Sequence, residues 1–304
     1  MQASQLLAAA RRVRLAGFPL ARDTLAGGYR SAYRGLGLEY EESREYAPGD
    51  DVAAMDWKVT ARLSRPFVKR FREERARTVM LAVDISASMA AGAGPGDTPF
   101  AAALAAVILA RSAAASRDRV GLVLFSDRVE AFVPPGKGPG QEQAVAAALA
   151  GTAPTGRGTD PGPALALVAA TLPHRSPVFC ISDFAGADFA AALGKLAARH
   201  DVTAVAVSGD AARELPPAGI VTVVEAETGR RLTLDCAGPA ARARLAAAHQ
   251  QARQARLDAL RRAGAGVVAI DPAAHPGPAL AAHFRGRAQG AGYARPGRGN
   301  AAHG

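Results

Sequence analysis

The sequence predicts a protein of the α/β class, with a largely parallel sheet, helices on both faces and an antiparallel edge. Along residues 78–275, short runs rich in Val, Leu and Ile alternate with Ala- and Leu-rich stretches of helical length. Strands separated by helical segments are typical of units whose strands pair in parallel. Short turn sequences at residues 126–128 and 227–229 each separate two strand patterns, and they predict hairpins.

The individual elements follow from these patterns in chain order. Strands are predicted at residues 79–83, 120–125, 129–133, 178–181, 202–207, 221–224, 231–234 and 267–270. Helices are predicted between them at residues 100–115, 141–150, 164–172, 188–198 and 239–262. Continuous apolar strands such as 79–83 are expected where both faces of a sheet are covered.

The two ends of the chain do not follow this alternation. Residues 1–26 hold a candidate basic amphipathic helix, and residues 27–77 are dense in Tyr, Arg, Glu and Gly and contain the only Trp. We expect residues 1–77 to form a separate module or an ordered extension. The α/β domain would then span residues 78–275, followed by a disordered tail at residues 276–304.

Composition narrows the class of protein. A hydrophobic share of 49% with 21% charged residues is typical of a soluble globular chain of 304 residues. The longest apolar stretch, residues 100–110, is shorter than the roughly 20 residues that cross a membrane, so we expect a buried helix there. Two cysteines make no disulfide framework, and Cys180 lies inside an apolar strand pattern. No signal peptide is visible, and a reducing cytoplasm is the expected compartment.

The charge balance does not by itself predict a nucleic-acid-binding protein. The formal net charge is +10, but nearly all the basic residues are Arg in an Ala- and Gly-rich chain. No aromatic residues interleave with them to form a platform on which bases could stack. We therefore expect no nucleic-acid partner.

The first strand pattern ends in an acid and two hydroxyls at alternate positions, Asp84, Ser86 and Ser88. In an extended segment these side chains turn to one side, and ligands of open α/β sheets gather at the carboxyl ends of strands. Oxygen atoms of this kind suit Mg²⁺. Taken alone, the acid could equally cap the next helix.

Two other segments add oxygen ligands at the same predicted edge. Asp183 closes the strand pattern of residues 178–181, and a glycine-rich loop at residues 155–160 carries Thr159 just before a helix that starts with Pro161. The candidate metal ligands are therefore two acids and three hydroxyls: Asp84, Ser86, Ser88, Thr159 and Asp183.

This combination resembles the metal-ion-dependent adhesion site of von Willebrand factor A domains. Upstream, residues 35–40, 43–51, 55–57 and 60–62 are similar to the signature of the DUF58 family, so that the resemblance covers residues 28–235. It implies a von Willebrand A-like, doubly wound sheet with an N-terminal extension. Longer relatives carry membrane helices ahead of the signature, whereas this chain looks like a short, soluble form. Ala53 and Ala54 stand where relatives often carry Arg, so no Arg contact is expected there.

The predicted site favours recognition over chemistry. If the hydroxyls bind Mg²⁺ (or Mn²⁺ or Ca²⁺) directly and the acids act partly through water, the double positive charge of the ion is incompletely neutralised. An open coordination position then favours an outside carboxylate. We expect a non-enzymatic, metal-dependent adaptor whose client presents an acidic side chain. The family resemblance implies a MoxR-type AAA+ ATPase as partner, in the assembly or maturation of that client.

The alternative is a metal-dependent, phosphoryl-directed hydrolase that uses the same carboxylates. Several enzyme classes lack their signatures. There is no G-x-S-x-G elbow and no G-x-x-x-x-G-K-[ST] loop. Ser86 also stands where a phosphatase of the haloacid dehalogenase type needs a second acid.

The upstream signature supplies a second set of candidate residues, which could form a partner surface or a small folding core. They are Arg44, Tyr46, Gly49, Asp50, Asp56, Trp57 and Arg62. For Trp57 we expect a structural role, because large aromatic side chains are usually buried. The basic run at residues 62–77 predicts a solvated face, or a surface for an acidic partner.

Overall fold

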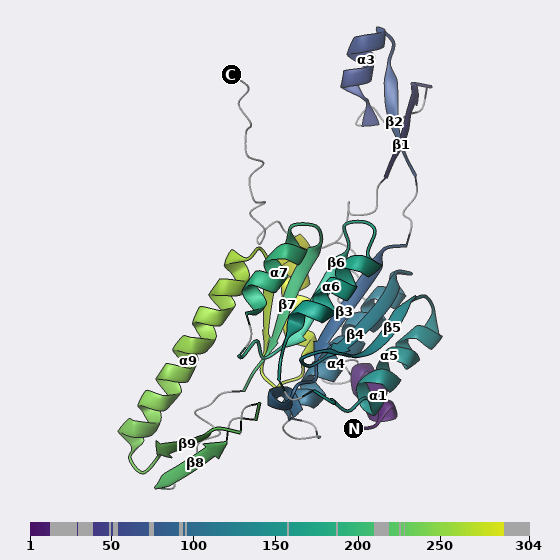
Figure 1. Cartoon of the computed structure of the whole chain (residues 1–304). Coiled ribbons are helices and arrows are strands. Elements are labelled where there is room, and N and C mark those ends of the chain that lie inside the picture. Colours follow the sequence, from purple (N-terminus) through teal and green to yellow (C-terminus); the bar gives the residue numbers. More distant parts are fainter. Residues whose placement is uncertain are drawn as a thin grey trace, which may run out of the picture. The chain divides into compact units, whose positions relative to one another are not determined.

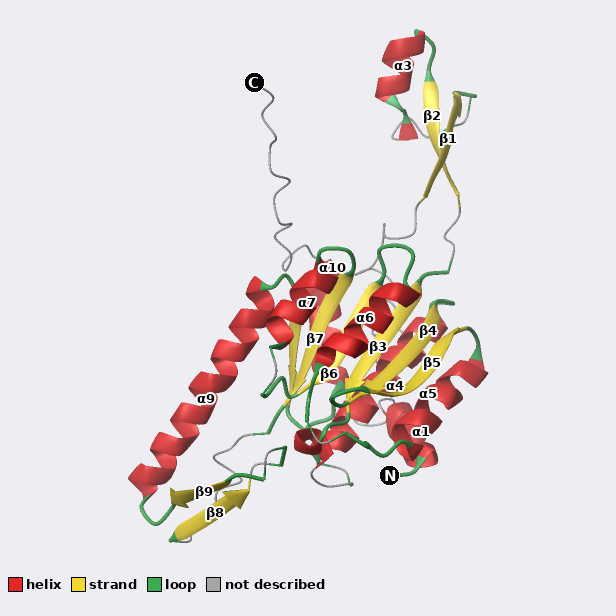
Figure 2. Cartoon of the chain, in the orientation of Figure 1, coloured by secondary structure: helices red, strands yellow, loops and turns green. Residues whose placement is uncertain are grey.

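The computed structural model describes two compact units, Arg34–Arg77 and the rest of the chain. The described residues are 1–12, 29, 39–48, 50, 54–72, 76–90, 94, 96–156, 158–186, 188–209, 219–224, 226–227 and 229–288. Figures 1 and 2 label the elements of both units.

The larger unit is built on a six-stranded sheet in the order β10-β7-β6-β3-β4-β5. All neighbouring strands pair in parallel except β4 and β5, which form an antiparallel edge. The strands are β3 (Thr78–Asp84), β4 (Arg119–Phe125), β5 (Val129–Gly136), β6 (Pro177–Ser182), β7 (Asp201–Val207) and β10 (Gly266–Ile270). This mixed α/β arrangement with a mostly parallel sheet is the one that the sequence pattern predicts.

The strand order reverses between β3 and β6. From β3 the chain first adds β4 and β5 on one side, and it then returns to add β6, β7 and β10 on the other. In open parallel sheets, such a reversal leaves a crevice at the carboxyl ends of the two central strands, where ligands bind. In this chain the two strands end at Asp84 and Ser182.

Helices pack on both faces of the sheet (Figure 2). Alternate strand residues such as Met80, Ala82 and Cys180 join a core with α6 (Pro161–Thr171), α7 (Phe189–Ala197) and the end of α9 (Pro239–Arg262). On the opposite face, Phe179 packs edge-on against Phe284, with ring centroids 6.2 Å apart. The helices of that face are α1 (Ala3–Arg12), α4 (Thr98–Ala115), α5 (Pro139–Gly151) and α10 (Gly277–Ala288).

Helix α4 is the one helix in the described part of the chain that is long and apolar enough to cross a membrane. Its 18 residues have a mean hydropathy of 1.5, and 72% of them are buried inside the protein. A helix that is apolar all round belongs in the core of a large domain. It contacts β3, β4, β6 and β7, as the sequence predicts for a buried helix.

A two-stranded hairpin lies apart from the main sheet. It pairs β8 (Ile220–Val224) with β9 (Arg231–Asp235) in antiparallel register. Figure 1 shows it on the side of the larger unit where the strands β3 and β6 end. Both strands and the turn between them match the second hairpin predicted from the sequence.

The smaller unit is a hairpin with one short helix. Strands β1 (Glu39–Glu45) and β2 (Phe67–Arg72) pair antiparallel, and α3 (Trp57–Leu63) lies between them in the sequence. Val68 is buried, and it forms an isolated bridge with Met55. The sequence does not predict these strands, because charged residues interrupt the apolar ones in both of them.

The structure corrects the expected boundaries at both ends. Residues 277–288 form α10 instead of belonging to a disordered tail at 276–304, and Leu280 and Phe284 are fully buried. At the other end, α1 contacts α4 and α5 and belongs to the larger unit, so residues 1–77 are not one module. The rest of the predicted N-terminal helix, from residue 13, lies outside the described residues.

Candidate metal site at the strand ends

A buried carboxylate lies where the strand order reverses. Strands β3 and β6 pair with Val83 opposite Ile181, so Asp84 and Ser182 are the next pair along the two strands. Ser182 Oγ donates a hydrogen bond to Asp84 Oδ2 at 2.6 Å, and the backbone N–H of Ser86 donates to Asp84 Oδ1 at 2.9 Å. Asp84 is only 1% exposed. Both oxygens of this carboxylate are therefore oriented by the strand ends.

The surroundings of Asp84 disfavour its negative charge. Burial raises its pKa to about 6, and the nearby charge of Asp183 adds to the increase. Hydrogen bonds from Ser182 and Ser86 lower the pKa but offset only part of the effect of burial. A cation beside this carboxylate would favour the ionised form.

The two hydroxyls that follow Asp84 lie next to each other. Ser86 Oγ and Ser88 Oγ are 3.2 Å apart, and Ser88 belongs to a short 3₁₀ helix, η2 (Ala87–Ala90). Ser86 is fully buried, whereas Ser88 is half-buried. The sequence D-x-S-x-S therefore presents one carboxylate and two hydroxyls on the same side of the segment.

The second carboxylate, Asp183, follows β6 immediately. Its Oδ1 accepts a hydrogen bond from the backbone N–H of Ala185 at 2.9 Å, and the side chain is half-buried. The negative charge of Asp183 raises the pKa of Asp84. Asp183 and Asp84 thus stand at the ends of neighbouring strands, as the sequence predicts.

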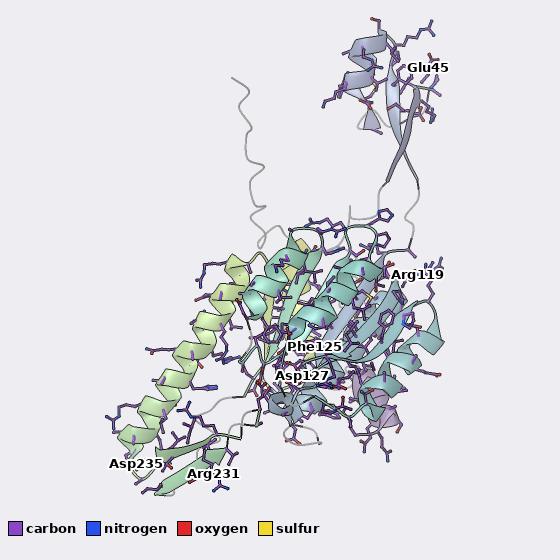
Figure 3. All side chains as sticks on the ribbon, viewed as in Figure 1. Glu45, Arg119, Phe125, Asp127, Arg231 and Asp235 are labelled. Atoms are coloured by element: carbon purple, nitrogen blue, oxygen red, sulfur yellow. The ribbon has the colours of Figure 1, made fainter. Side chains whose placement is uncertain are left out.

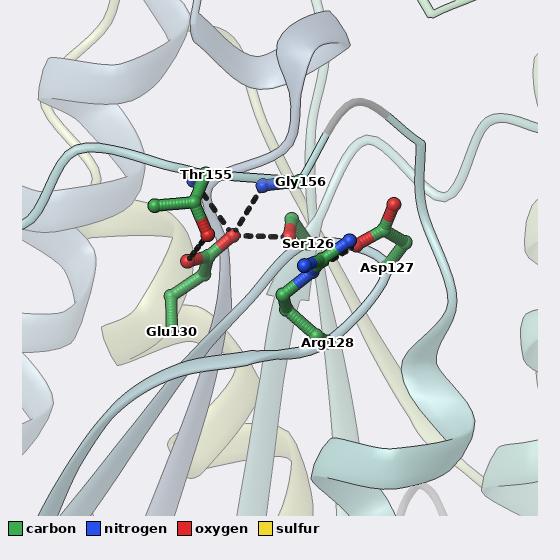
Figure 4. A network of polar contacts seen from close by, with 6 residues as sticks. All are labelled: Ser126, Asp127, Arg128, Glu130, Thr155 and Gly156. Carbon is green, nitrogen blue, oxygen red and sulfur yellow. Dashed lines mark hydrogen bonds and ion pairs between the residues drawn. The ribbon is translucent and has the colours of Figure 1, made fainter.

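The loop that carries Thr159 is held to the end of β4 by Glu130 (Figure 4). Glu130 Oε1 accepts from Ser126 Oγ at 2.5 Å and from the backbone N–H groups of Thr155 and Gly156 at 2.9 and 2.8 Å. Burial by itself would raise the pKa of Glu130, but these hydrogen bonds outweigh it and lower the pKa to about 2. The carboxylate therefore fixes the start of the loop while it remains ionised.

Asp160 makes two further hydrogen bonds that fix the end of this loop. The backbone N–H of Asp160 donates to the carbonyl of Ser126 at 2.9 Å, and the Asp160 side chain caps α6 through Gly162. A Cβ atom on Gly156 would lie within 3 Å of Ser126 Oγ and of Asp127 Oδ1, so a larger residue there would force these side chains to move. In Figure 3, Asp127 lies beside Phe125 at the end of β4.

Thr159 makes its hydrogen bond to a residue that the sequence did not suggest. Its Oγ1 donates to Glu227 Oε1 at 2.5 Å, and Glu227 lies in the turn of the β8–β9 hairpin. The structure thus joins Asp84, Ser86, Ser88 and Asp183 at one edge, and it places Thr159 against Glu227. The sequence gives no local signal for this contact, because 68 residues separate the two side chains.

The donor set suits a hard divalent cation. Mg²⁺ prefers oxygen ligands, and carboxylates with hydroxyls supply them without sulfur or imidazole. Within the described ranges, no group of three or more His, Cys, Asp or Glu side chains gathers as a metal cluster. A metal held at this edge would therefore depend on the serine and threonine hydroxyls as well as on the two acids.

In the smaller unit, the charged signature residues hold the backbone together. Arg44 makes two hydrogen bonds to Asp50, of 2.8 and 2.5 Å, and Asp50 also accepts from the backbone N–H of Ala47. The hydrogen bond from Arg44 is the main cause that lowers the pKa of Asp50. Asp56 caps α3 through Lys58 and Val59. These contacts favour a structural role for the acids.

The other signature residues differ in how far they are exposed to solvent. Trp57 is 66% exposed, which corrects the expectation that it is buried. No residue of α3 is buried. Arg62, at the end of α3, is also exposed, and Tyr46 is half-buried with its N–H bonded to the carbonyl of Pro66. Gly49 lies outside the described residues. Arg77, at the end of the basic run, is buried rather than solvated.

The comparisons with known proteins agree with the upstream signature. A family model described as "Protein of unknown function DUF58" matches residues 42–255, so this α/β chain belongs to the DUF58 family. The uncharacterized proteins Mb1516 of Mycobacterium bovis and Rv1480 of Mycobacterium tuberculosis are each 33% identical over 234 residues, which is 74% of this chain and 73% of theirs.

Solved structures are more distant. The conserved hypothetical protein BatB from Bacteroides thetaiotaomicron is 15% identical, with a TM-score of 0.47 over 70% of this chain and 100% of its own. An aerotolerance-related membrane protein from Bacteroides fragilis is 16% identical, with a TM-score of 0.46 over 69% and 98%. Similarities at this level carry no argument about function.

Proposed function

We propose that the larger unit is a von Willebrand A-like, doubly wound domain that binds Mg²⁺ and uses it for protein recognition. The observation that carries the proposal is the pair of carboxylates, Asp84 and Asp183, at the ends of the two strands where the order reverses. Ser86, Ser88 and Thr159 supply neutral oxygens. Mn²⁺ or Ca²⁺ could take the same position.

The charges favour recognition rather than catalysis. If the hydroxyls bind the cation directly and the two carboxylates act partly through water, the double positive charge of the cation is incompletely neutralised. Its open position then attracts an acidic side chain. In this proposal the client presents that side chain, and a MoxR-type AAA+ ATPase works with the adaptor in assembly or maturation of the client. The adaptor acts in the cytoplasm, performs no reaction of its own and binds no nucleic acid.

The test combines metal binding with partner capture. Calorimetric titration with Mg²⁺ and Mn²⁺ compares the native chain with Ser86→Ala and Asp183→Ala. A pull-down of the cognate ATPase is done with Mg²⁺ and again with chelator. We expect both variants to weaken metal binding and capture by at least about tenfold, which corresponds to one lost ligand contact.

Two variants serve as controls. Ser116→Ala removes a hydroxyl at the C-terminal end of α4. Asp258→Asn removes an acid on α9 whose side chain is partly exposed. Both should bind metal and partner like the native chain. Capture that persists in chelator would disprove the metal-bridged contact. Turnover of phosphate esters that depends on Asp84 would instead favour the hydrolase.

A further inference from the structure

We propose that Glu227, in the turn of the β8–β9 hairpin, is a resident carboxylate of the metal site that an incoming acidic side chain displaces. This inference rests on the proposed function and describes how that site is regulated. The hairpin would hold the open position of the cation until a partner replaces it.

The contacts of Glu227 place it between two loops that carry proposed ligands. Glu227 Oε1 accepts from Thr159 Oγ1 at 2.5 Å. On the other side, a Cβ built on Gly186 would lie only 3.3 Å from Glu227 Oε2. Gly186 follows Asp183 by three residues and has a φ of +81°, so a glycine there gives the carboxylate room to approach. The acid therefore reaches both the Thr159 loop and the Asp183 loop.

The hydrogen bond with Thr159 is compatible with metal binding. A hydroxyl has one hydrogen to donate and two lone pairs to offer. If Thr159 donates its hydrogen to Glu227, its lone pairs remain available for the cation. The bond thus orients the hydroxyl as a ligand and holds the Glu227 carboxylate beside it.

The hairpin is suited to being displaced. It has only two strands, and isolated hairpins of two strands are marginally stable in water. Its apolar side chains gain little from burial, since Ile220, Val224 and Leu232 are 77%, 55% and 43% exposed. Moving the turn away from the site therefore breaks few packing contacts. The carboxylate of a partner can then occupy the coordination position that Glu227 leaves.

The test counts the water molecules on bound Mn²⁺. Mn²⁺ is loaded onto the full chain, and water-proton relaxation reports its exchangeable waters. We expect Glu227→Gln to raise the relaxation enhancement by the equivalent of one water and to weaken Mn²⁺ binding roughly 10- to 100-fold. Acetate, as a small carboxylate probe, should lower the enhancement at several-fold lower concentration in the variant than in the native chain.

Controls separate this inference from the proposed function. Glu142→Gln makes the same charge change on α5 and should behave like the native chain. Glu227→Asp keeps the charge but draws the carboxylate back, and it should resemble Glu227→Gln. Identical relaxation and acetate response in all four proteins would overturn the role of Glu227 alone. Mn²⁺ binding that is absent, or insensitive to Ser86→Ala and Asp183→Ala, would overturn the metal site itself.

Discussion

Ser182 has two hydrogen-bonding roles at the buried end of β6. Its Oγ donates to Asp84 Oδ2 at 2.6 Å and accepts from the backbone N–H of Phe184 at 2.9 Å. Ser182→Ala would leave a buried acceptor and a buried donor without this partner, and an unsatisfied buried group costs about 1–3 kcal/mol. We expect the variant to lower the free energy of unfolding by roughly 2 kcal/mol, measured by urea denaturation in chelator.

A second buried serine provides the control for this experiment. Ser112 Oγ donates to the carbonyl of Ile108 at 2.8 Å inside α4, where Ala is the better helix former. Ser112→Ala should change stability by less than about 1 kcal/mol. An equal loss in the two variants would mean that Asp84 does not depend on Ser182.

At the same scale, the local sequence pattern indicates the proposed ligands but not the residues that contact them. Asp84, Ser86 and Ser88 are visible because they alternate after an apolar strand, and the Asp183 motif repeats the pattern. Ser182, Glu130 and Glu227 act across separations of 98, 25 and 68 residues. Only the pairing of strands and the path of loops bring such residues to their partners.

At the scale of the elements, the strands that are buried along their length are ones that the sequence pattern predicts. Strands β6 and β7 are buried along their whole length, and their continuous apolar runs predict them. Strands β1 and β2 read EYEESRE and FVKRFR, in which charged residues interrupt the apolar ones. Helix α10 was missed because Gly and Arg dilute its pattern, although Phe284 anchors it in the core.

The loop that carries Thr159 should lose stability in acid through Glu130. The pKa of Glu130 in the folded chain is about 2, well below its ordinary value of 4.5, because hydrogen bonds favour the ionised form. Its contribution is therefore complete above about pH 4.5 and is lost as the pH falls toward 2. We expect Glu130→Gln to lower the free energy of unfolding by roughly 1–2 kcal/mol at pH 6.5.

The difference between the native chain and Glu130→Gln should shrink as the pH is lowered from 4.5 to 3, in guanidinium unfolding at several pH values. The control is Glu142→Gln, which makes the same change in the first turn of α5. Its difference from the native chain should change less over this pH range. A constant difference across this range would mean that the ionised form of Glu130 does not hold the loop.

The same loop also depends on a close approach of the backbone. A Cβ on Gly156 would meet Ser126 Oγ and Asp127 Oδ1 within 3 Å, whereas a Cβ on Gly158 would meet only Asp127 Cβ, at 3.9 Å. We expect Gly156→Ala to cost about 1–3 kcal/mol, as overpacking does, and to weaken Mn²⁺ binding by moving Thr159. Gly158→Ala is the matched control and should melt within a few degrees of the native chain. Equal effects of the two substitutions would remove the steric argument.

Over the whole molecule, the chain joins two units with very different amounts of core. The larger unit buries both faces of its sheet, whereas the smaller unit, Arg34–Arg77, buries only Val68, Asp56 and Arg77 among its described side chains. A unit of this size is marginal without a larger core. Polar contacts therefore carry a larger share of its stability, and the helix cap made by Asp56 is central among them.

The two units should accordingly unfold as separate events. Asp56 caps α3 and accepts from Ser43 Oγ of β1 at 2.8 Å, so Asp56→Ala removes about 1–2 kcal/mol from the smaller unit. Hydrogen exchange should then speed up severalfold in β1, β2 and α3, with no change in β3 and β6. The reciprocal variant is Asp160→Ala, which removes the cap of α6 in the larger unit and should leave β1 and β2 unaffected. If either variant accelerated exchange in both units alike, the chain would unfold as one cooperative body.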